Sequence, residues 1–398
     1  VPADARRGLR HVVSSIADLL AGGSPALDAD ATHRDAPAFW LYSSGSTGAP
    51  KGCVHLQHDM VVCAELFGKG VLGIRETDRT FSVAKLFFAY GLGNALYFPL
   101  SVGATTILWS GPPTPQHVYA VIEKHRPTLF YAVPTAYAMM LAKEREASAE
   151  RARDFDLSSV RLAVSAGEAL PPALYERFKQ RFGVDIVDGI GSTEALHMFI
   201  SNRPDAIRPG SSGLIVPGYD ARILDDQKQT VAAGEIGTLW ISGDSVCDGY
   251  WNKHEKTKET IEGRWIRTGD KYSQDVDGFY WYAGRSDVML KVGGQWVSPI
   301  EVEGALVAHP AVLECGVVGR EDRDALVKPM AFVVLRDAGA ANEQLALELQ
   351  QFVRDRVAEY KRPRWVRFVS ELPKTATGKI QRFRLRELAS NPDSARLV

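Results

Sequence analysis

The feature that most constrains the fold is an alternation of segment types between about residues 104 and 194. In this alternation an apolar run leads into a loop and then into an amphipathic segment. Two units, VRLAVSAGE and VDIVDGIGSTE, end on glycine-containing loops, and LPPALYERFKQRFG between them has the proline entry and glycine exit of a helix. This alternation predicts a largely parallel α/β sheet. Such sheets bind ligands at the carboxyl ends of their strands, so we expect the chemistry in these loops.

The pattern changes twice further along the chain. From about residue 210 the strands become short and rich in turns, and from about Ser286 an α+β segment begins. We therefore expect an α/β protein with a large multi-sheet domain over residues 1–285 and a small α+β C-terminal domain over 286–398. The β-rich subdomain of the large domain is expected at about 210–285.

Composition excludes several classes of partner. Lys and Arg number 47 against 48 Asp and Glu, which does not favour nucleic acid. No run approaches about 18 apolar residues, and the polar start VPADARRGLR has no signal-peptide pattern, so we expect no membrane partner. The nine histidines include no HExxH, and the cysteines have no paired spacing, which predicts reduced thiols, a cytoplasmic setting and no structural metal. The cysteines are Cys53, Cys63, Cys247 and Cys315.

The glycine-rich stretch SSGSTGAPKG, residues 43–52, follows an apolar run. Glycines let successive backbone N–H groups surround an anion, the hydroxyls can donate, and Lys51 adds positive charge. A phosphate loop is therefore favoured over a solvated linker. A Walker A loop would need GxxxxGK[ST], but Pro50 replaces its second glycine and Gly52 follows the lysine. A P-loop NTPase that releases ADP is disfavoured for this reason.

Two further clusters carry carboxylates. In DGIGSTE, Glu194 could hold Mg²⁺ and Thr193 could contact a phosphate, although a helix cap has the same pattern. In RWIRTGD, Asp270 could accept both hydroxyls of a ribose, or it could be the satisfied charge of a turn.

Two later segments are basic. GRSDVMLKVGGQWVSPIEVE, residues 284–303, combines Arg285 and Lys291 with a glycine pair, and PKTATGKIQR places Lys379 after a Thr-Gly turn. Taken alone, the first also fits a β-turn and the second a solvated loop.

In this order and spacing, the five segments resemble the motifs of the adenylate-forming superfamily of acyl-CoA synthetases, NRPS adenylation domains and luciferases. The glycine-rich stretch SSGSTGAPKG resembles its loop [ST]SG[ST]TGxPKG, and GIGSTE resembles its [GY]GxTE element. TGD, GRSDVMLK and PKTATGKIQR resemble its later elements. The resemblance covers nearly all of residues 38–388. KLFFAYGLGNALYFPL and DGIGSTEALHMFISNRP are similar to the benzoate-CoA ligase branch.

The resemblance implies an AMP-forming acid–thiol ligase that uses ATP, Mg²⁺ and CoA. Benzoate or a substituted benzoate would attack the α-phosphate, and the CoA thiol would then displace AMP. It also implies a monomer or homodimer. Roughly forty residues precede the phosphate loop, whereas the family has a longer region there, so we expect that the N-terminal part of the large domain is missing.

The same resemblance implies roles for the matching nucleotide-site residues. Thr193 and Glu194 match the α-phosphate and Mg²⁺ positions, and Lys379 the lysine that engages the carboxylate in the first step. Asp270 and Arg285 match the ribose contacts. The β- and γ-phosphate contacts are matched by Ser44, Gly45, Ser46, Thr47, Gly48 and Lys51, and the adenine contacts by Gly167, Glu168, Asp188 and Ile190, where aliphatic packing replaces the aromatic stacking frequent in the family.

The remaining matches concern the acid, CoA and the hinge. Asp287 matches the point about which the C-terminal domain rotates as a mobile lid between the half-reactions. His197 could face the carboxylate or be a core histidine. The acid pocket is expected at Ala89, Tyr90, Ala166, Gly191 and His197, and the CoA tunnel at Lys291, Gly293, Gly294 and Trp296. Another acyl-CoA synthetase, for fatty or hydroxyaryl acids, and a catalytically incompetent nucleotide-binding fragment are the alternatives.

Overall fold

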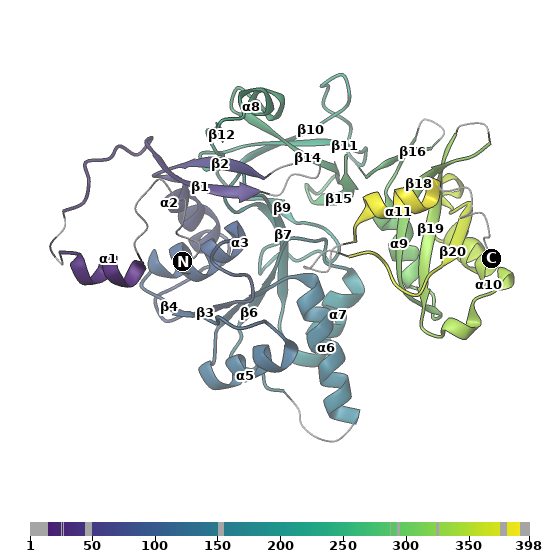
Figure 1. Ribbon diagram of the computed structural model, residues 1–398, viewed down its shortest axis with the longest axis horizontal. Helices are drawn as coiled ribbons and strands as arrows, with labels where there is room; N and C mark the ends of the chain where they lie inside the picture. Colours follow the sequence, from purple (N-terminus) through teal and green to yellow (C-terminus); the bar gives the residue numbers. More distant parts are fainter. Residues whose placement is uncertain are drawn as a thin grey trace, which may run out of the picture.

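The computed structural model of the protein describes residues 15–24, 26, 28–43, 50–149, 155–286, 288–292, 295–323, 326–374 and 380–390. A seven-stranded sheet forms the centre of its larger part (Figure 1). The pairs along β4–β3–β5–β6–β7 are parallel, whereas β8 and β9 add antiparallel pairs at one edge. The expected α/β class with a largely parallel sheet is therefore confirmed. The strands are β3 (Arg79–Ser82), β4 (Thr105–Ile107), β5 (Leu129–Ala132), β6 (Leu162–Ser165), β7 (Ile186–Gly191), β8 (Met198–Ser201) and β9 (Leu214–Ile215).

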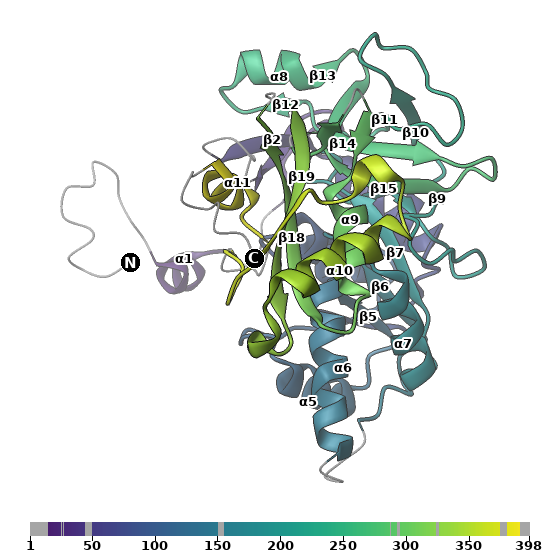
Figure 2. The same ribbon diagram turned by 90° about the vertical axis from the view of Figure 1, so that its right-hand side faces the viewer.

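Three helices cover one face of this sheet, as both views show (Figures 1 and 2). They are α5 (Pro115–His125), α6 (Pro134–Ala149) and α7 (Pro172–Phe182). Their apolar side chains share one buried cluster with β5 and β6. Gly183 ends α7 with a φ of 68°, a left-handed conformation that glycine adopts without a Cβ penalty. The expected proline entry and glycine exit of this helix are confirmed.

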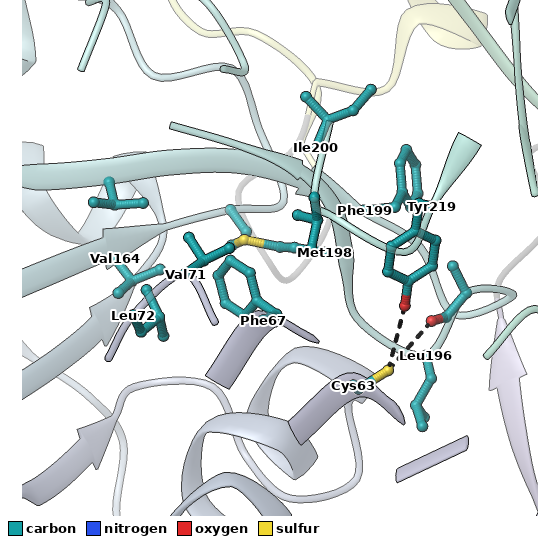
Figure 3. Close-up of a cluster of buried hydrophobic side chains, with 14 of the residues drawn as sticks. Cys63, Phe67, Val71, Leu72, Val164, Leu196, Met198, Phe199, Ile200 and Tyr219 are labelled. Atoms are coloured by element: carbon teal, nitrogen blue, oxygen red, sulfur yellow. Dashed lines mark hydrogen bonds between the residues drawn. The ribbon is translucent and has the colours of Figure 1, made fainter. Parts of the chain in front are cut away.

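A second cluster fills the space between the other face of the central sheet and the β-rich part (Figure 3). Its aromatic side chains come from short helical segments and from the central and β-rich strands, so this core ties the three layers together. The segments are α2 (Asp59–Cys63), the π-helical η1 (Ala64–Lys69), α3 (Ala89–Leu92), the π-helical η2 (Gly93–Tyr97) and α4 (Phe98–Leu100).

The β-rich part contains two antiparallel sheets. The first follows the order β10–β11–β14–β13, with β15 paired to β14, and the second follows β1–β2–β12. The short helix α8 (His254–Thr260) packs against β12, β13 and β14, whereas α1 (Ile16–Gly22) has no buried residue. The strands are β1 (Pro37–Ser43), β2 (Lys51–Leu56), β10 (Asp220–Leu224), β11 (Gly237–Ser242), β12 (Gly249–Tyr250), β13 (Ile261–Glu262), β14 (Trp265–Gln274) and β15 (Tyr280–Arg285).

The elements from Leu290 onward gather on one side of the larger part (Figure 1). A hairpin and a three-stranded sheet with one parallel pair pack with α9 and α10 around one apolar cluster. The last helix, α11, packs on the other face of the three-stranded sheet in a second cluster. The elements are β16 (Leu290–Val292), β17 (Gln295–Val297), α9 (Pro299–Val307), β18 (Val312–Glu321), β19 (Val327–Leu335), η3 (Ala338–Ala340), α10 (Glu343–Arg354), η4 (Glu359–Lys361), β20 (Trp365–Phe368) and α11 (Arg382–Ser390).

Candidate active site

The loops after β6 and β7 leave the same edge of the central sheet. The two strands pair in parallel with Ser165 opposite Asp188, so their carboxyl ends point the same way. In the first loop Gly167 has a φ of 89°, a conformation that favours glycine, and Thr135 donates a hydrogen bond to Glu168 at 3.2 Å. This is the edge at which a sheet of this type binds its ligand.

The loop after β7 carries Thr193 and Glu194, whose side chains are half-buried. Its backbone is bonded into the protein body. The Cys247 amide donates to the Glu194 carbonyl oxygen at 2.7 Å, and the Ser245 hydroxyl donates to the Ala195 carbonyl oxygen at 2.8 Å. The carbonyl groups of this loop are therefore anchored, which limits the positions open to the Thr193 and Glu194 side chains.

A lysine and a tyrosine contact Glu194. Tyr250 is opposite Cys53 in the pairing of β12 with β2, and its hydroxyl donates to Glu194 Oε1 at 2.8 Å. The Lys51 ammonium donates to the same hydroxyl at 3.3 Å and lies 3.8 Å from Glu194 Oε1. Burial and the charge of Glu194 raise the pKa of Tyr250, so its hydroxyl stays protonated. The three side chains form one connected polar cluster.

Tyr250 is a residue that sequence reasoning missed. Its contact with Glu194 spans 56 positions, and the dipeptide Gly-Tyr carries no chemical motif of its own. Knowledge of the pairing of β12 with β2 would have placed Tyr250 near the site. A two-residue strand, however, leaves no periodic signal in the sequence from which to predict that pairing.

Asp270 and Arg285 face each other across neighbouring strands. They are direct partners in the pairing of β14 with β15, and Arg285 Nη1 lies 3.2 Å from Asp270 Oδ1. Burial raises the pKa of Asp270 to about 6, against the lowering effect of Arg285, and the charge of Glu194 also raises it. Gly269 leaves room for this pair, since a Cβ there would lie 2.9 Å from the Arg285 guanidinium.

Asp188 and Ile190 lie on β7 just before the Thr193 loop. Burial raises the pKa of Asp188 to about 7, and its Oδ1 has no hydrogen-bond partner among the described residues. A buried oxygen without a partner needs a hydrogen-bond donor, and the exocyclic amine of an adenine could be that donor. Ile190 is half-buried against the second core cluster, which fits aliphatic packing.

The expected acid-pocket residues are partly brought together. His197 is 3 % exposed, its Nε2 lies 3.1 Å from Asn94 Oδ1, and its ring centroid is 5.6 Å from that of Tyr90. Burial lowers the pKa of His197 to about 3, so its imidazole is neutral and cannot offer a positive charge to a carboxylate. The core-histidine interpretation is therefore favoured. Tyr90 donates to the Val164 carbonyl oxygen at 3.0 Å, which fixes its ring at the end of β6.

The other three pocket positions surround the same edge. Ala89 begins α3, Ala166 is the buried residue after β6, and Gly191 ends β7. A Cβ at Gly191 would lie 2.5 Å from the His197 carbonyl oxygen, so this position excludes side chains.

Lys291 and Trp296 are opposite each other in the β16–β17 hairpin. The Lys291 ammonium lies 5.3 Å from the Trp296 ring centroid, and Lys271, next to Asp270 on β14, lies 4.8 Å from the same centroid. The hairpin therefore contacts the strand that carries Asp270. Beside it is a hollow of about 150 Å³ that sequence reasoning missed, lined by Val292, Gln295, Lys328, Tyr360 and Arg364.

Some expected residues lie outside the described part of the chain. They are the phosphate-loop residues Ser44, Gly45, Ser46, Thr47 and Gly48, the hinge Asp287, the glycines Gly293 and Gly294, and Lys379.

The described residues include no group of three or more His, Cys, Asp or Glu side chains that could hold a metal ion by themselves. Mg²⁺ commonly binds one or two carboxylates together with the phosphate oxygens of a substrate. The half-buried Glu194 fits this mode. All four cysteines are buried and free.

The chain belongs to the AMP-binding enzyme family. The family model matches residues 7–251, and the model of the AMP-binding enzyme C-terminal domain matches residues 301–379. Among the helices of the described residues, none has the length and apolar character needed to cross a membrane.

Similar proteins include aryl-CoA ligases. The chain is 54 % identical to benzoate–CoA ligase of Thauera aromatica, over 94 % of this chain and 70 % of that protein. It is 48 % identical to the 4-hydroxybenzoate–CoA/benzoate–CoA ligase of Rhodopseudomonas palustris, over 94 % of this chain and 68 % of that protein. A benzoate CoA ligase structure from Burkholderia xenovorans matches with a TM-score of 0.82 and 51 % identity, covering 93 % of this chain and 72 % of that one.

A structure of the anthranilate CoA ligase AuaEII with anthranoyl-AMP matches with a TM-score of 0.86 and 49 % identity, covering 94 % of this chain and 72 % of that one.

Proposed function

We propose that the protein is an ATP-dependent aryl-acid–CoA ligase that converts benzoate or a substituted benzoate to its CoA thioester and releases AMP and pyrophosphate. The observation that carries this proposal is the contact of Lys51 and Tyr250 with Glu194 beside the Asp270–Arg285 pair. Lys51 supplies positive charge for a triphosphate, and Asp270 supplies a hydrogen-bond acceptor for a ribose, at the same edge of the sheet. The similarity to benzoate–CoA ligases supports the aryl acid as substrate.

In the first step, a carboxylate oxygen of the acid attacks the α-phosphorus of ATP and the bond to the pyrophosphate oxygen breaks. Both reactants are anions, so the site must offset their repulsion. Lys51 and the phosphate-loop hydroxyls would neutralise the β- and γ-phosphates, and Lys379 would draw the carboxylate and the α-phosphate together. Holding the reactants in line lowers the barrier further.

Nucleotide orientation would come from three further residues. Asp270 accepts the ribose hydroxyls while Arg285 holds its carboxylate, and Asp188 accepts from the adenine amine. Glu194 would hold Mg²⁺, which when bound neutralises charge on the phosphate oxygens. Tyr250 then orients Glu194 toward the site.

In the second step, the CoA thiol attacks the acyl carbon and AMP leaves. We propose a domain boundary at 285/286 and rotation about Asp287 between the steps. Lys291, Trp296 and the glycines between them would then line the pantetheine path. The cationic and aromatic hollow next to this hairpin, with Lys328 and Arg364, suits the charged end of CoA.

The acid would bind flat beside Tyr90, where Ala89 and Ala166 leave room for a ring. A hydrophobic pocket discriminates a single methylene by only about 1–3 kcal/mol, so substituted benzoates should compete. A fatty acid lacks a ring to fill this space and is the weaker candidate. The free thiols are consistent with a reducing, cytoplasmic setting, and we propose a monomer or homodimer there.

The test is product analysis with benzoate, ATP, Mg²⁺ and CoA. The proposal predicts AMP, pyrophosphate and benzoyl-CoA in equal amounts, with hexanoate a poorer substrate than benzoate. ADP as the nucleotide product, or the absence of turnover with a panel of aryl acids, would refute it.

A further inference from the structure

A buried histidine–aspartate pair lies behind the loop that carries Thr193 and Glu194. His55 on β2 and Asp59, the first residue of α2, are both 0 % exposed. His55 Nδ1 lies 2.7 Å from Asp59 Oδ2, and His55 Nε2 lies 2.8 Å from the Thr193 carbonyl oxygen. Neither residue has a part in the nucleotide, acid or CoA contacts proposed above.

The hydrogen-bond partners decide where the protons lie. The Thr193 carbonyl oxygen can only accept, so His55 Nε2 must carry a hydrogen. Asp59 Oδ2 also accepts from the Leu56 amide at 3.1 Å. Whether the proton between Nδ1 and Oδ2 is carried by the ring or by the carboxyl group, Nε2 carries a hydrogen and the imidazole donates it to Thr193.

The surroundings hold the ring in this orientation. Phe39 stacks on the His55 imidazole, with ring centroids 5.2 Å apart and planes inclined by 20°. His58 Nε2 lies 3.5 Å from the other oxygen of Asp59. Rotation of His55 would break two hydrogen bonds in a fully buried place, where unpaired polar groups are costly.

His55 completes a row of anchored carbonyl groups. Those of Glu194 and Ala195 are bonded to the segment around Ser245 and Cys247, and the Cys63 thiol also donates to the Ala195 carbonyl oxygen. The Thr193 carbonyl oxygen accepts from the Leu196 amide at 3.2 Å within its own turn, and the His55 bond ties it to β2 as well.

We propose that His55 is a positioning residue for adenylation, and that Asp59 fixes the ring form that allows His55 to hold the Thr193 peptide. This inference rests on the proposed function for its effect on rate, because Thr193 and Glu194 are the groups that would touch the α-phosphate and Mg²⁺. Loss of such an orienting contact typically lowers activity roughly ten- to hundredfold.

The test compares His55→Gln with His55→Asn in aryl-acid-dependent exchange of pyrophosphate into ATP. A glutamine amide nitrogen lies near the place of Nε2 and can still donate to Thr193, whereas an asparagine amide lies near Nδ1 and cannot. His55→Gln should retain most of the exchange rate, and His55→Asn should lose roughly ten- to hundredfold in kcat with little change in KM for the acid. Equal rates for the two variants, whether high or low, would overturn the proposal.

Asp59→Asn provides a second variant. Asp59 Oδ2 accepts from the Leu56 amide, so in the variant the asparagine oxygen must occupy the position of Oδ2. This oxygen can only accept from the ring, so the ring hydrogen lies on Nδ1 and Nε2 is unprotonated. The pyrophosphate exchange rate of Asp59→Asn should be reduced as much as that of His55→Asn. An exchange rate equal to that of the wild type would count against the proposal. His309, a buried histidine on the C-terminal side bonded to Glu348, is the matched control, and neither His309→Gln nor His309→Asn should change the exchange rate.

A spectroscopic measurement separates this inference from the proposed function. Nitrogen-15 NMR of histidine-labelled protein should show Nε2 of His55 protonated in the wild type and unprotonated in Asp59→Asn. An unprotonated Nε2 in the wild type would overturn the inference even in an active enzyme. If no aryl acid supports exchange, the proposed function fails, and the NMR result still decides the assignment of His55.

Discussion

Tyr250 donates a hydrogen bond to Glu194 at 2.8 Å, and the same hydroxyl accepts one from Lys51 at 3.3 Å. A single phenol thus connects the lysine that follows the glycine-rich loop with the carboxylate expected to hold Mg²⁺. The ring also lies 4.4 Å from the Lys51 ammonium, so one side chain orients both charges.

Tyr250→Phe should weaken the use of Mg-ATP while leaving the fold intact. The variant keeps the ring under Lys51 but loses the bond to Glu194, and hydrogen bonds to charged groups contribute about 1.5–3 kcal/mol. We expect kcat/KM for Mg-ATP to fall roughly ten- to hundredfold in pyrophosphate exchange, with little change in KM for the acid. Tyr175→Phe on α7 is the control, since it also removes a hydroxyl bonded to a carboxylate, Asp185, and should leave exchange unchanged. An unchanged Tyr250→Phe would contradict the role of this phenol.

Asp188 should impose a pH dependence on stability. Burial raises its pKa from 3.8 to about 7, so the folded protein holds a proton that the unfolded chain releases near pH 4. The stability of the wild type relative to Asp188→Asn should therefore fall as the pH rises from about 4 to about 7, and should change little above that. Thermal unfolding midpoints of both proteins across this range test the prediction.

The control for this substitution is Asp205→Asn, on an exposed turn. The difference in unfolding midpoint between the wild type and Asp205→Asn should show no comparable decline between pH 4 and 7. A difference between the wild type and Asp188→Asn that stays constant or grows with pH would refute a raised pKa at Asp188.

Gly93→Ala should impair the acid pocket. A Cβ at this position would lie 2.5 Å from His197 Cδ2 and 2.9 Å from the Tyr97 hydroxyl, so the ring of His197 must shift. Overpacking of this kind typically costs about 1–3 kcal/mol. We expect KM for the acid to rise while KM for ATP changes little, as measured by exchange at varied benzoate and ATP.

Gly304→Ala on α9 is the matched control for added volume. No atom outside its own helix lies within 4 Å of the added Cβ, so the variant should gain about 0.5–1 kcal/mol of stability without a change in KM for the acid. Equal KM values for Gly93→Ala and the wild type would show that His197 does not limit the pocket.

The central sheet could be predicted from the sequence because its apolar runs and amphipathic helices alternate locally. The loops that begin at Ala166 and Ser192 follow from the same pattern, since the ends of parallel strands share an edge. The contact of Tyr250 with Glu194 could not be predicted, because it depends on the pairing of β12 with β2 across the chain. His55 follows the glycine-rich motif by three residues, but the motif assigns it no partner, and only the fold brings the Thr193 carbonyl group to its ring.

His197 illustrates a second limit. A histidine beside a strand end is compatible with a ligand or with a core side chain, and the sequence alone does not separate the two. The choice depends on desolvation, since packing against Phe67 and Phe98 removes water from the imidazole and lowers its pKa.

The most direct test of the central claim follows an oxygen atom. The protein is incubated with ATP, Mg²⁺, CoA and benzoate labelled with oxygen-18 in its carboxylate, and the AMP is analysed by mass spectrometry. If the carboxylate attacks the α-phosphorus and the thiol then attacks the acyl carbon, each AMP carries one atom of the label. Unlabelled AMP formed together with benzoyl-CoA would contradict the adenylate route.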